Sequence, residues 1–197
     1  MKKFFGFTLA EILIAMGIVS VVAAMTMPTL VNNYRKNTYA LNIRKIVNEI
    51  EQAADIQLTE EEKNELAKTS VFKNADGLDN FIKSRFDVAA YTKGFSDTYK
   101  YSGGVANNSS FINCSSNKCY LLSNGAAIQV EKVDNNILFY IDTNGKSAPN
   151  SVGQDLFRFF LNNEGTVEDT SNTDCVSKSN AEGCLKKLMD NDWKMDY

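Results

Sequence analysis

Residues 1–30 read MKKFFGFTLAEILIAMGIVSVVAAMTMPTL. This stretch divides into a short basic leader at residues 1–6 and an apolar run at residues 7–30. In a helix that rises about 1.5 Å per residue, the run reaches about 36 Å, which is enough to cross a hydrocarbon core of about 30 Å. Basic residues favour the cytoplasmic side of a membrane, so Lys2 and Lys3 place the leader there. The pattern predicts one membrane-spanning helix.

The apolar run carries one ionisable side chain, that of Glu11. A secretory signal peptide or a plain membrane anchor would also explain the hydrophobicity, and Val22-Ala23-Ala24 offers a small-residue cleavage site before Met25. However, an ionisable group inside a bilayer costs a few kcal/mol and usually marks a function. Neither a disposable signal nor a plain anchor needs such a group. Glu11 therefore favours a segment that stays in the mature protein and has its own task.

Residues 6–11 read GFTLAE and lead directly into the apolar run. This arrangement resembles the processing site of type IV prepilins and type II secretion pseudopilins. In that family the membrane-bound prepilin peptidase cuts after the glycine, on the cytoplasmic side, and methylates the new amino terminus. The resemblance implies a cut between Gly6 and Phe7, with Phe7 as the N-methylated first residue. The apolar segment then stays in the product, which is the opposite of secretory processing.

The resemblance also gives Glu11 a physical partner. After cleavage, Phe7 bears a free amine, and Glu11 of one subunit would neutralise the amine of its neighbour in the apolar filament core. Such a charge pair offsets much of the desolvation cost that either group alone would carry, and it fixes the axial stagger of the subunits. Pro28 removes a helix donor near the end of the apolar run. In this family a proline at that place accompanies local melting or kinking of the helix.

The function implied by the resemblance is that of a structural subunit of a type IV pilus or a type II secretion pseudopilus. Its partners would be other pilin or pseudopilin subunits, the prepilin peptidase and the inner-membrane assembly platform. The chain would cross the bacterial inner membrane once, with its globular domain outside the cytoplasm, and would then enter the pilus or the periplasmic pseudopilus. A minor competence pilin that binds DNA and a secreted protein with a conventional signal peptide are the alternatives.

The rest of the chain is predicted to form a pilin-like α+β fold. Apolar or small residues recur near a 3.6-residue period up to about Leu58, which predicts that residues 31–58 form the amphipathic half of one long helix. Residues 59–197 are assigned to a globular domain, in which Thr59 and Glu62 have capping-box spacing for a helix over 60–68. A further helix is expected over 78–86, an irregular connection over 87–118, and a helical turn over 185–189. Three or four antiparallel strands are expected over 120–122, 126–132, 137–142 and 156–161, with a hairpin at Asn124-Gly125.

Four cysteines, Cys114, Cys119, Cys175 and Cys184, indicate disulfides, because an even count is typical of an exported, loop-rich domain. Four cysteines allow three pairings, of which we favour the two local ones. A four-thiolate zinc site is the alternative, although the spacings fit the usual Cys-x2-Cys knuckle poorly. The Cys175–Cys184 pair resembles the C-terminal cysteine loop of type IVa pilins, and closing it would stabilise the domain by about 2–3 kcal/mol.

Residues 142–155, DTNGKSAPNSVGQD, form a turn-rich segment between two predicted strands. The segment resembles a loop of many pseudopilin-like proteins, and some major pseudopilins bind calcium in a C-terminal loop. Calcium takes several oxygen ligands, and Asp142, Asn144, Asn150 and Asp155 could supply them. The alternative is a loop whose Asp and Asn side chains bond only to local backbone. No other cofactor is indicated.

Composition weighs against two classes of function. The chain contains no histidine, which removes the commonest general base and zinc ligand, and no paired-acid motif stands out, so we expect no enzyme. The formal net charge is −3, and broad electrostatic binding of nucleic acid needs clustered Lys and Arg. The candidate basic residues for a DNA-binding patch, Lys83, Arg85, Lys93 and Lys100, are scattered. On sequence grounds we therefore expect no nucleic-acid partner.

Overall fold

The computed structural model describes residues 6–92, 112, 118–145, 147, 149–170, 175 and 181–196. The helical elements are α1 (Leu9–Glu60), the 3-10 helix η1 (Leu66–Lys68), α2 (Ser70–Lys73), α3 (Gly77–Arg85) and α4 (Cys184–Asp190). The strands are β1 (Val88–Thr92), β2 (Lys118–Leu122), β3 (Ala127–Val133), β4 (Asn136–Asp142), β5 (Leu156–Leu161) and β6 (Val167–Glu168). The chain forms two compact units, Met1–Thr38 and Tyr39–Tyr197.

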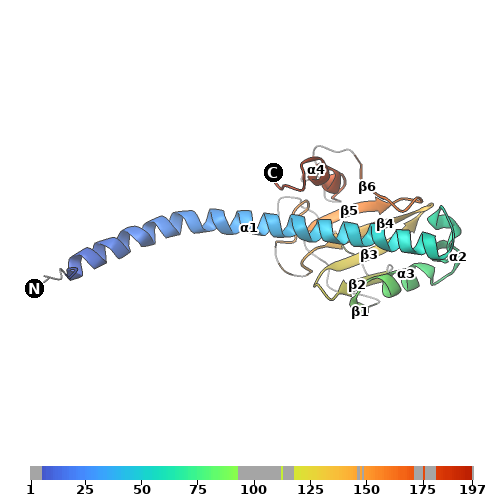
Figure 1. Ribbon diagram of the computed structural model, residues 1–197, viewed down its shortest axis with the longest axis horizontal. Helices are drawn as coiled ribbons and strands as arrows, with labels where there is room; N and C mark the ends of the chain where they lie inside the picture. Colours follow the sequence, from blue (N-terminus) through green and yellow to red (C-terminus); the bar gives the residue numbers. More distant parts are fainter. Residues whose placement is uncertain are drawn as a thin grey trace, which may run out of the picture. The chain divides into compact units, whose positions relative to one another are not determined.

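The second unit contains one antiparallel sheet, with the order β1-β2-β3-β4-β5-β6 among the described residues. Every strand pairs with its neighbour in the sequence, so the sheet is a meander, and the C-terminal part of α1 crosses one of its faces (Figure 1). The predicted α+β architecture, a long N-terminal helix followed by a small antiparallel sheet, is confirmed. The sheet is larger than the three or four strands that we expected.

The core lies between this part of α1 and the sheet. The buried helix positions follow the 3.6-residue period: Ala40, Ile43, Ile46, Val47, Ile50, Ala53, Ala54 and Gln57. Alternate residues of β4 and β5 contribute to the same core, and Phe139 of β4 stacks on Phe159 of β5 with ring centroids 5.9 Å apart. The amphipathic pattern therefore positions the sheet. Two apolar side chains of the same part of the sequence, Tyr34 and Leu41, lie outside this stripe, with exposed fractions of 72% and 64%.

Turn residues account for the sheet connections. Asn124-Gly125 closes the β2–β3 hairpin as predicted, with Gly125 at a φ of 89° that favours glycine. Gly165, between β5 and β6, has a φ of 88°, and a side chain there would lie 3.1 Å from Leu58 Cδ1 and 3.3 Å from Ala54 Cβ. That turn therefore needs glycine both for its backbone conformation and for its close approach to α1.

Two local predictions after α1 were wrong. Thr59 does not begin a new helix, because α1 continues to Glu60 and the chain then turns at Glu62, which has a positive φ of 52°. The capping-box pattern paired Glu62 with Thr59. Instead, the carboxylate of Glu61 accepts a hydrogen bond from the following segment, at Ser70 N. The region expected to be irregular contains β1.

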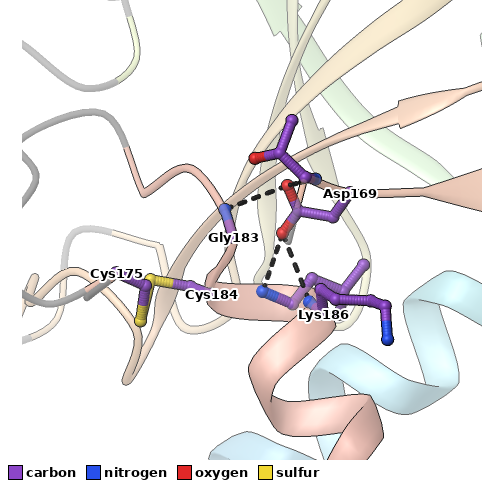
Figure 2. Close-up of a disulfide and its surroundings, with 7 residues drawn as sticks. Asp169, Cys175, Gly183, Cys184 and Lys186 are labelled. Carbon is purple, nitrogen blue, oxygen red and sulfur yellow. Dashed lines mark hydrogen bonds between the residues drawn. A yellow bond between two sulfur atoms is a disulfide. The ribbon is translucent and has the colours of Figure 1, made fainter. Parts of the chain in front are cut away.

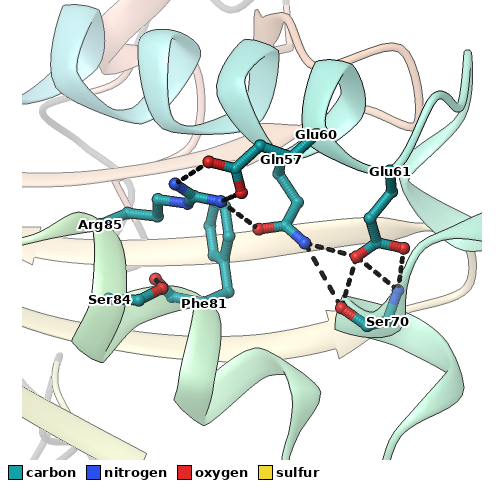
Figure 3. Close-up of polar contacts among 7 residues, drawn as sticks. All are labelled: Gln57, Glu60, Glu61, Ser70, Phe81, Ser84 and Arg85. Atoms are coloured by element: carbon teal, nitrogen blue, oxygen red, sulfur yellow. Dashed lines mark hydrogen bonds and ion pairs between the residues drawn. The ribbon is translucent and has the colours of Figure 1, made fainter.

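A polar cluster of Gln57, Glu60, Glu61, Ser70 and Arg85 joins the end of α1 to α2 and α3 (Figure 3). The carboxylate of Glu61 accepts the backbone N–H of Ser70 at 3.0 and 2.9 Å, at the first residue of α2. Arg85, at the end of α3, pairs with Glu60 and donates to Gln57 Oε1 at 3.1 Å. The cluster thus adds polar contacts between α1 and two short helices whose buried apolar side chains are Val71, Phe81 and Ile82.

Candidate functional site

The N-terminal unit presents an exposed apolar helix. Large apolar side chains from Leu9 to Val31 are exposed, and α1 is the helix, among the described residues, that is long and apolar enough to cross a membrane. Gly6 and Phe7 precede its first residue, Leu9, and Phe7 is 84% exposed. A side chain at Gly6 would meet no atom within 4 Å. The fold around this position therefore does not require glycine.

Glu11 is bound to its own chain by Thr8, which the sequence reasoning missed. Thr8 N and Thr8 Oγ1 both donate to Glu11 Oε2 at 2.8 Å, and Glu11 N lies 3.3 Å from Thr8 Oγ1. This is a capping box, in which Thr8 caps the helix and the acid three residues later bonds back. The spacing Thr8-x-x-Glu11 ahead of an apolar run was the signal that could have revealed it. The capping box supplies donors to a carboxylate that otherwise stands on an apolar helix.

The loop between β4 and β5 brings the four predicted calcium ligands together. Asp142 and Asp155 are fully buried. Asn150 N donates to Asp155 Oδ2 at 2.8 Å, and Ser151 N donates to Asp155 Oδ1 at 2.6 Å. Both oxygens of Asp155 thus accept backbone N–H groups and shape the loop. Asp142 Oδ1 accepts Asn144 N at 3.2 Å, an Asx turn of the kind that the local alternative foresaw.

Oxygen atoms converge in the middle of this loop. The side-chain oxygen of Asn150 faces Asp142 Oδ2 at 3.2 Å, the Gly145 carbonyl at 3.2 Å and the Ser147 carbonyl at 3.3 Å. In the opposite orientation of the amide, its nitrogen donates to all three of these oxygens and the contacts are satisfied. Calcium takes six to eight oxygen ligands from carboxylates, amides, backbone carbonyls and water. The oxygens of this loop are therefore of the right kind, and water would fill the remaining coordination positions.

The electrostatics of the loop also favour a positive charge. Burial, and then the charge of Asp155, raise the pKa of Asp142 to about 8. Burial likewise raises the pKa of Asp155 above its usual range. At neutral pH the loop therefore holds a carboxyl group that favours its protonated form, and a nearby cation would lower the cost of ionising it. Among the described residues no group of three or more acidic, histidine or cysteine side chains could hold a metal, so carbonyl and amide oxygens would have to complete any site.

The C-terminal segment is tied down by a disulfide and by one aspartate (Figure 2). Cys175 and Cys184 form the predicted bridge, with their Cα atoms 4.8 Å apart. Asp169, at the end of β6, accepts the N–H groups of Gly183 and Leu185 at 3.0 Å and of Lys186 at 3.3 Å. Gly183 occupies the N-cap position of α4 and has no side chain, so Asp169 caps the helix from a distance. Burial raises the pKa of this carboxyl despite those bonds.

The other predicted bridge falls partly outside the described residues. Cys119 lies buried in β2 and is disulfide-bonded, while Cys114 is outside the described residues. The Cys175–Cys184 bridge excludes the alternative of a four-thiolate zinc site. On the aromatic tail, Trp193 packs under Arg44, whose guanidinium lies 5.7 Å from the ring centroid, and Tyr197 is outside the described residues.

The scattered basic residues do not form a patch where the structure describes them. Lys83 pairs with Asp79 at 2.9 Å, and Arg85 pairs with Glu60. Each of these two cations is therefore neutralised within the domain. Lys93 and Lys100 lie outside the described residues. The described part of the surface gives no support to a DNA-binding module.

Comparison with known proteins agrees with the N-terminal geometry. Residues 1–27 match the family described as the prokaryotic N-terminal methylation motif, which is the signature of type IV pilins and pseudopilins. No curated protein and no solved structure matches the chain. The motif and the apolar helix fit a membrane-anchored, single-pass protein, and the motif is typical of structural rather than catalytic subunits.

Proposed function

We propose that this chain, which carries the pilin and pseudopilin signature, is a structural subunit of a type IV pilus or a type II secretion pseudopilus. Prepilin peptidase would cut after Gly6 and methylate Phe7, and the subunit would assemble through α1 with other subunits on the inner-membrane platform. The observation that carries the proposal is Glu11, an ionisable side chain near the start of an exposed apolar helix that directly follows the processing glycine.

The local structure supports a processing role for Gly6. The position is open and needs no unusual backbone angle, so folding does not select glycine there. If glycine is required at this position, the requirement comes from a partner of the chain. A peptidase that accepts only a small residue before the cut would be such a partner. Phe7, which follows it, is exposed and precedes the helix, so the bond between them is accessible.

The environment of Glu11 supports a role in assembly. Thr8 provides two donors to one carboxylate oxygen, Oε2, but these are neutral groups and leave the negative charge uncompensated. A neighbouring subunit's new N-terminal amine would supply the missing positive charge in an apolar environment, where such a pair is strong. The pairing would select one axial stagger between subunits, because only that stagger joins the two groups.

Mass spectrometry of the mature N-terminus tests the processing step. The full chain is extracted from membranes and its first peptide is sequenced. We expect N-methyl-Phe7 as the first residue. A mature start at Met25 would instead identify a conventional secretory signal and reject the filament role. A bulky replacement of Gly6 should leave the uncut chain in the membrane, and mature protein from that variant would reject the proposed cut.

Replacement of Glu11 tests the assembly step. In Glu11→Ala we expect cleavage after Gly6 to continue while incorporation into sheared filaments falls sharply, by roughly tenfold or more, because a charge pair in an apolar core is lost. Ser20→Ala is the matched control: Ser20 lies in the same exposed segment, and its hydroxyl bonds only to the Met16 carbonyl. Normal incorporation of Glu11→Ala would remove the pairing role.

A second proposal concerns the loop over residues 142–155. The two buried carboxyl groups of Asp142 and Asp155, together with the Gly145 and Ser147 carbonyls near the Asn150 side chain, would supply oxygen ligands for a calcium ion that stabilises the connection between β4 and β5. Calcium titration of the globular domain, followed by calorimetry, tests it. We expect one site in the wild type and none in Asp142→Asn, and equal binding by both would reject Asp142 as a ligand.

A further inference from the structure

Beyond the apolar segment, α1 carries only basic charge for several turns. No Asp or Glu occurs between Glu11 and Glu49. The Lys and Arg residues in that interval are Arg35, Lys36, Arg44 and Lys45. In a chain that is acidic as a whole, this segregation gives the helix next to the span a local charge opposite to that of the domain. Such a stretch is complementary to an anionic partner.

If residues 7–30 span the hydrocarbon core, Arg35 lies at the depth of the lipid head groups. It follows Leu30, the last residue of the apolar run, by five positions, which is about 7.5 Å along an α-helix. The polar layer of a bilayer is about 5–7.5 Å thick on each side of the hydrocarbon core. Tyr34, its neighbour, is 72% exposed, and tyrosine is typical of this interface. Both residues belong to the same compact unit as the apolar segment.

A groove of about 470 Å³ leads from the apolar segment to Arg35. It lies on the face of α1 around Pro28 and is lined by Ala24, Met27, Pro28, Val31, Asn32 and Arg35. Pro28 has no N–H, so the helix cannot continue its regular bonding to the Ala24 carbonyl at this point. The groove is therefore apolar at one end and carries an amide and a guanidinium at the other.

We propose that this groove binds an anionic phospholipid of the membrane, with an acyl chain along the apolar end and the phosphate at Arg35. Arg35 supplies a planar guanidinium that can bond a phosphate with two N–H groups, and Asn32 adds an amide beside it. The inference rests on the membrane-spanning segment of the proposed function. It adds a lipid preference for the subunit while it waits in the membrane, before other subunits cover α1.

Lipid selectivity measured by electron paramagnetic resonance tests the proposal. The full chain is reconstituted in vesicles that contain spin-labelled phosphatidylglycerol or spin-labelled phosphatidylcholine, and the motionally restricted fraction of each lipid is compared. We expect the wild type to prefer phosphatidylglycerol by about fivefold, the effect of one basic residue near a charged membrane surface. Arg35→Gln should bring the ratio close to one, and Arg35→Lys should keep most of it.

Lys45→Gln is the matched control, since it removes the same charge ten residues further along the chain from an exposed side chain that pairs only loosely with Glu49, at 3.8 Å. Its selectivity should equal that of the wild type. Equal selectivity in the wild type and Arg35→Gln would overturn the proposal. An Arg35→Gln variant that keeps its lipid preference but fails to enter filaments would also overturn the proposal, because Arg35 would then contact a neighbouring subunit rather than a lipid. If neither lipid shows a restricted fraction, the segment does not insert, and the membrane-anchored function fails with it.

Discussion

At alkaline pH, replacement of Asp142 by asparagine should stabilise the globular domain in the absence of calcium and destabilise it in the presence of calcium. The reason lies in the buried loop, where Asp142 faces the charge of Asp155 and three oxygens surround the Asn150 side chain. Asparagine keeps the shape of the side chain but removes the charge. It therefore relieves the repulsion when no cation is bound and removes a ligand when one is.

The magnitude follows from the pKa of Asp142, which is raised from 3.8 to about 8 on folding. Because the folded state favours the protonated form, the contribution of this group to stability is full below the unfolded pKa and is lost as the pH rises towards the folded pKa. The loss is about 1.4 kcal/mol for each pH unit in that window, or roughly 4 kcal/mol between about pH 5 and about pH 8. Water entering the loop would reduce this figure, so it is an upper limit. Calcium at 100 times its dissociation constant would return about 2.7 kcal/mol.

Urea unfolding of a fragment with residues 31–197 provides the assay, with a chelator or with excess calcium at each pH. In chelator, the unfolding free energy of the wild type should fall as the pH rises, whereas that of Asp142→Asn should fall less and exceed the wild type near the alkaline end. In calcium the order should reverse. A wild type that is insensitive to pH in chelator, or an Asp142→Asn variant that is less stable than the wild type in chelator at every pH, would refute the electrostatic account of this loop.

Three further substitutions test other contacts. Thr8→Val should lower incorporation into sheared filaments by about fivefold, as expected for a lost capping interaction of about 1 kcal/mol, while Thr8→Ser should keep it. Equal incorporation of Thr8→Val and the wild type would show that Glu11 does not need the cap. Asp169→Ala should reduce the unfolding free energy by about 1–3 kcal/mol, since four backbone N–H groups lose their acceptor, whereas Asp190→Ala, at an exposed pair, should change it by less than about 0.5 kcal/mol. Gly165→Ala should cost about 1–3 kcal/mol in the same urea assay, because it combines a positive φ with a close approach to α1, and an unchanged midpoint would mean that the turn relaxes freely.

The parts of the fold that the sequence predicted well are those governed by a regular pattern. The period of apolar residues located α1 and its contact with the sheet, and alternating or continuous apolar runs located β3, β4 and β5. Asn124-Gly125 predicted a hairpin because that dipeptide tolerates the positive φ of a tight turn. In each case the residues involved are neighbours in the sequence, so their chemistry can be read locally.

The predictions failed where distant residues decide the local structure. The spacing of Thr59 and Glu62 is typical of a helix start, but Thr59 belongs to the last turn of α1. Glu61 instead caps α2, nine residues further along the chain. β1 was missed because its short sequence becomes a strand only by pairing with β2. The acceptor that caps α4 comes from Asp169, fourteen positions before the Gly183 N–H that it binds, and no local pattern announces it.

The same limit applies to the candidate sites, and it shows which acidic residues need a partner outside the chain. Asp155 and Asp169 are buried, yet the oxygens of each accept several backbone N–H groups, so the fold itself compensates them. Asp142 also accepts backbone N–H groups, from Asn144 and Gly145, but burial and the charge of Asp155 still raise its pKa to about 8. Among the described contacts, Glu11 has the two neutral donors of Thr8 at one oxygen. The sequence marks all four as acids in apolar or turn-rich surroundings. The positions of the donors and of the neighbouring charges, which only the structure gives, distinguish Asp155 and Asp169 from the two acids for which we propose a cation or a neighbouring amine as partner.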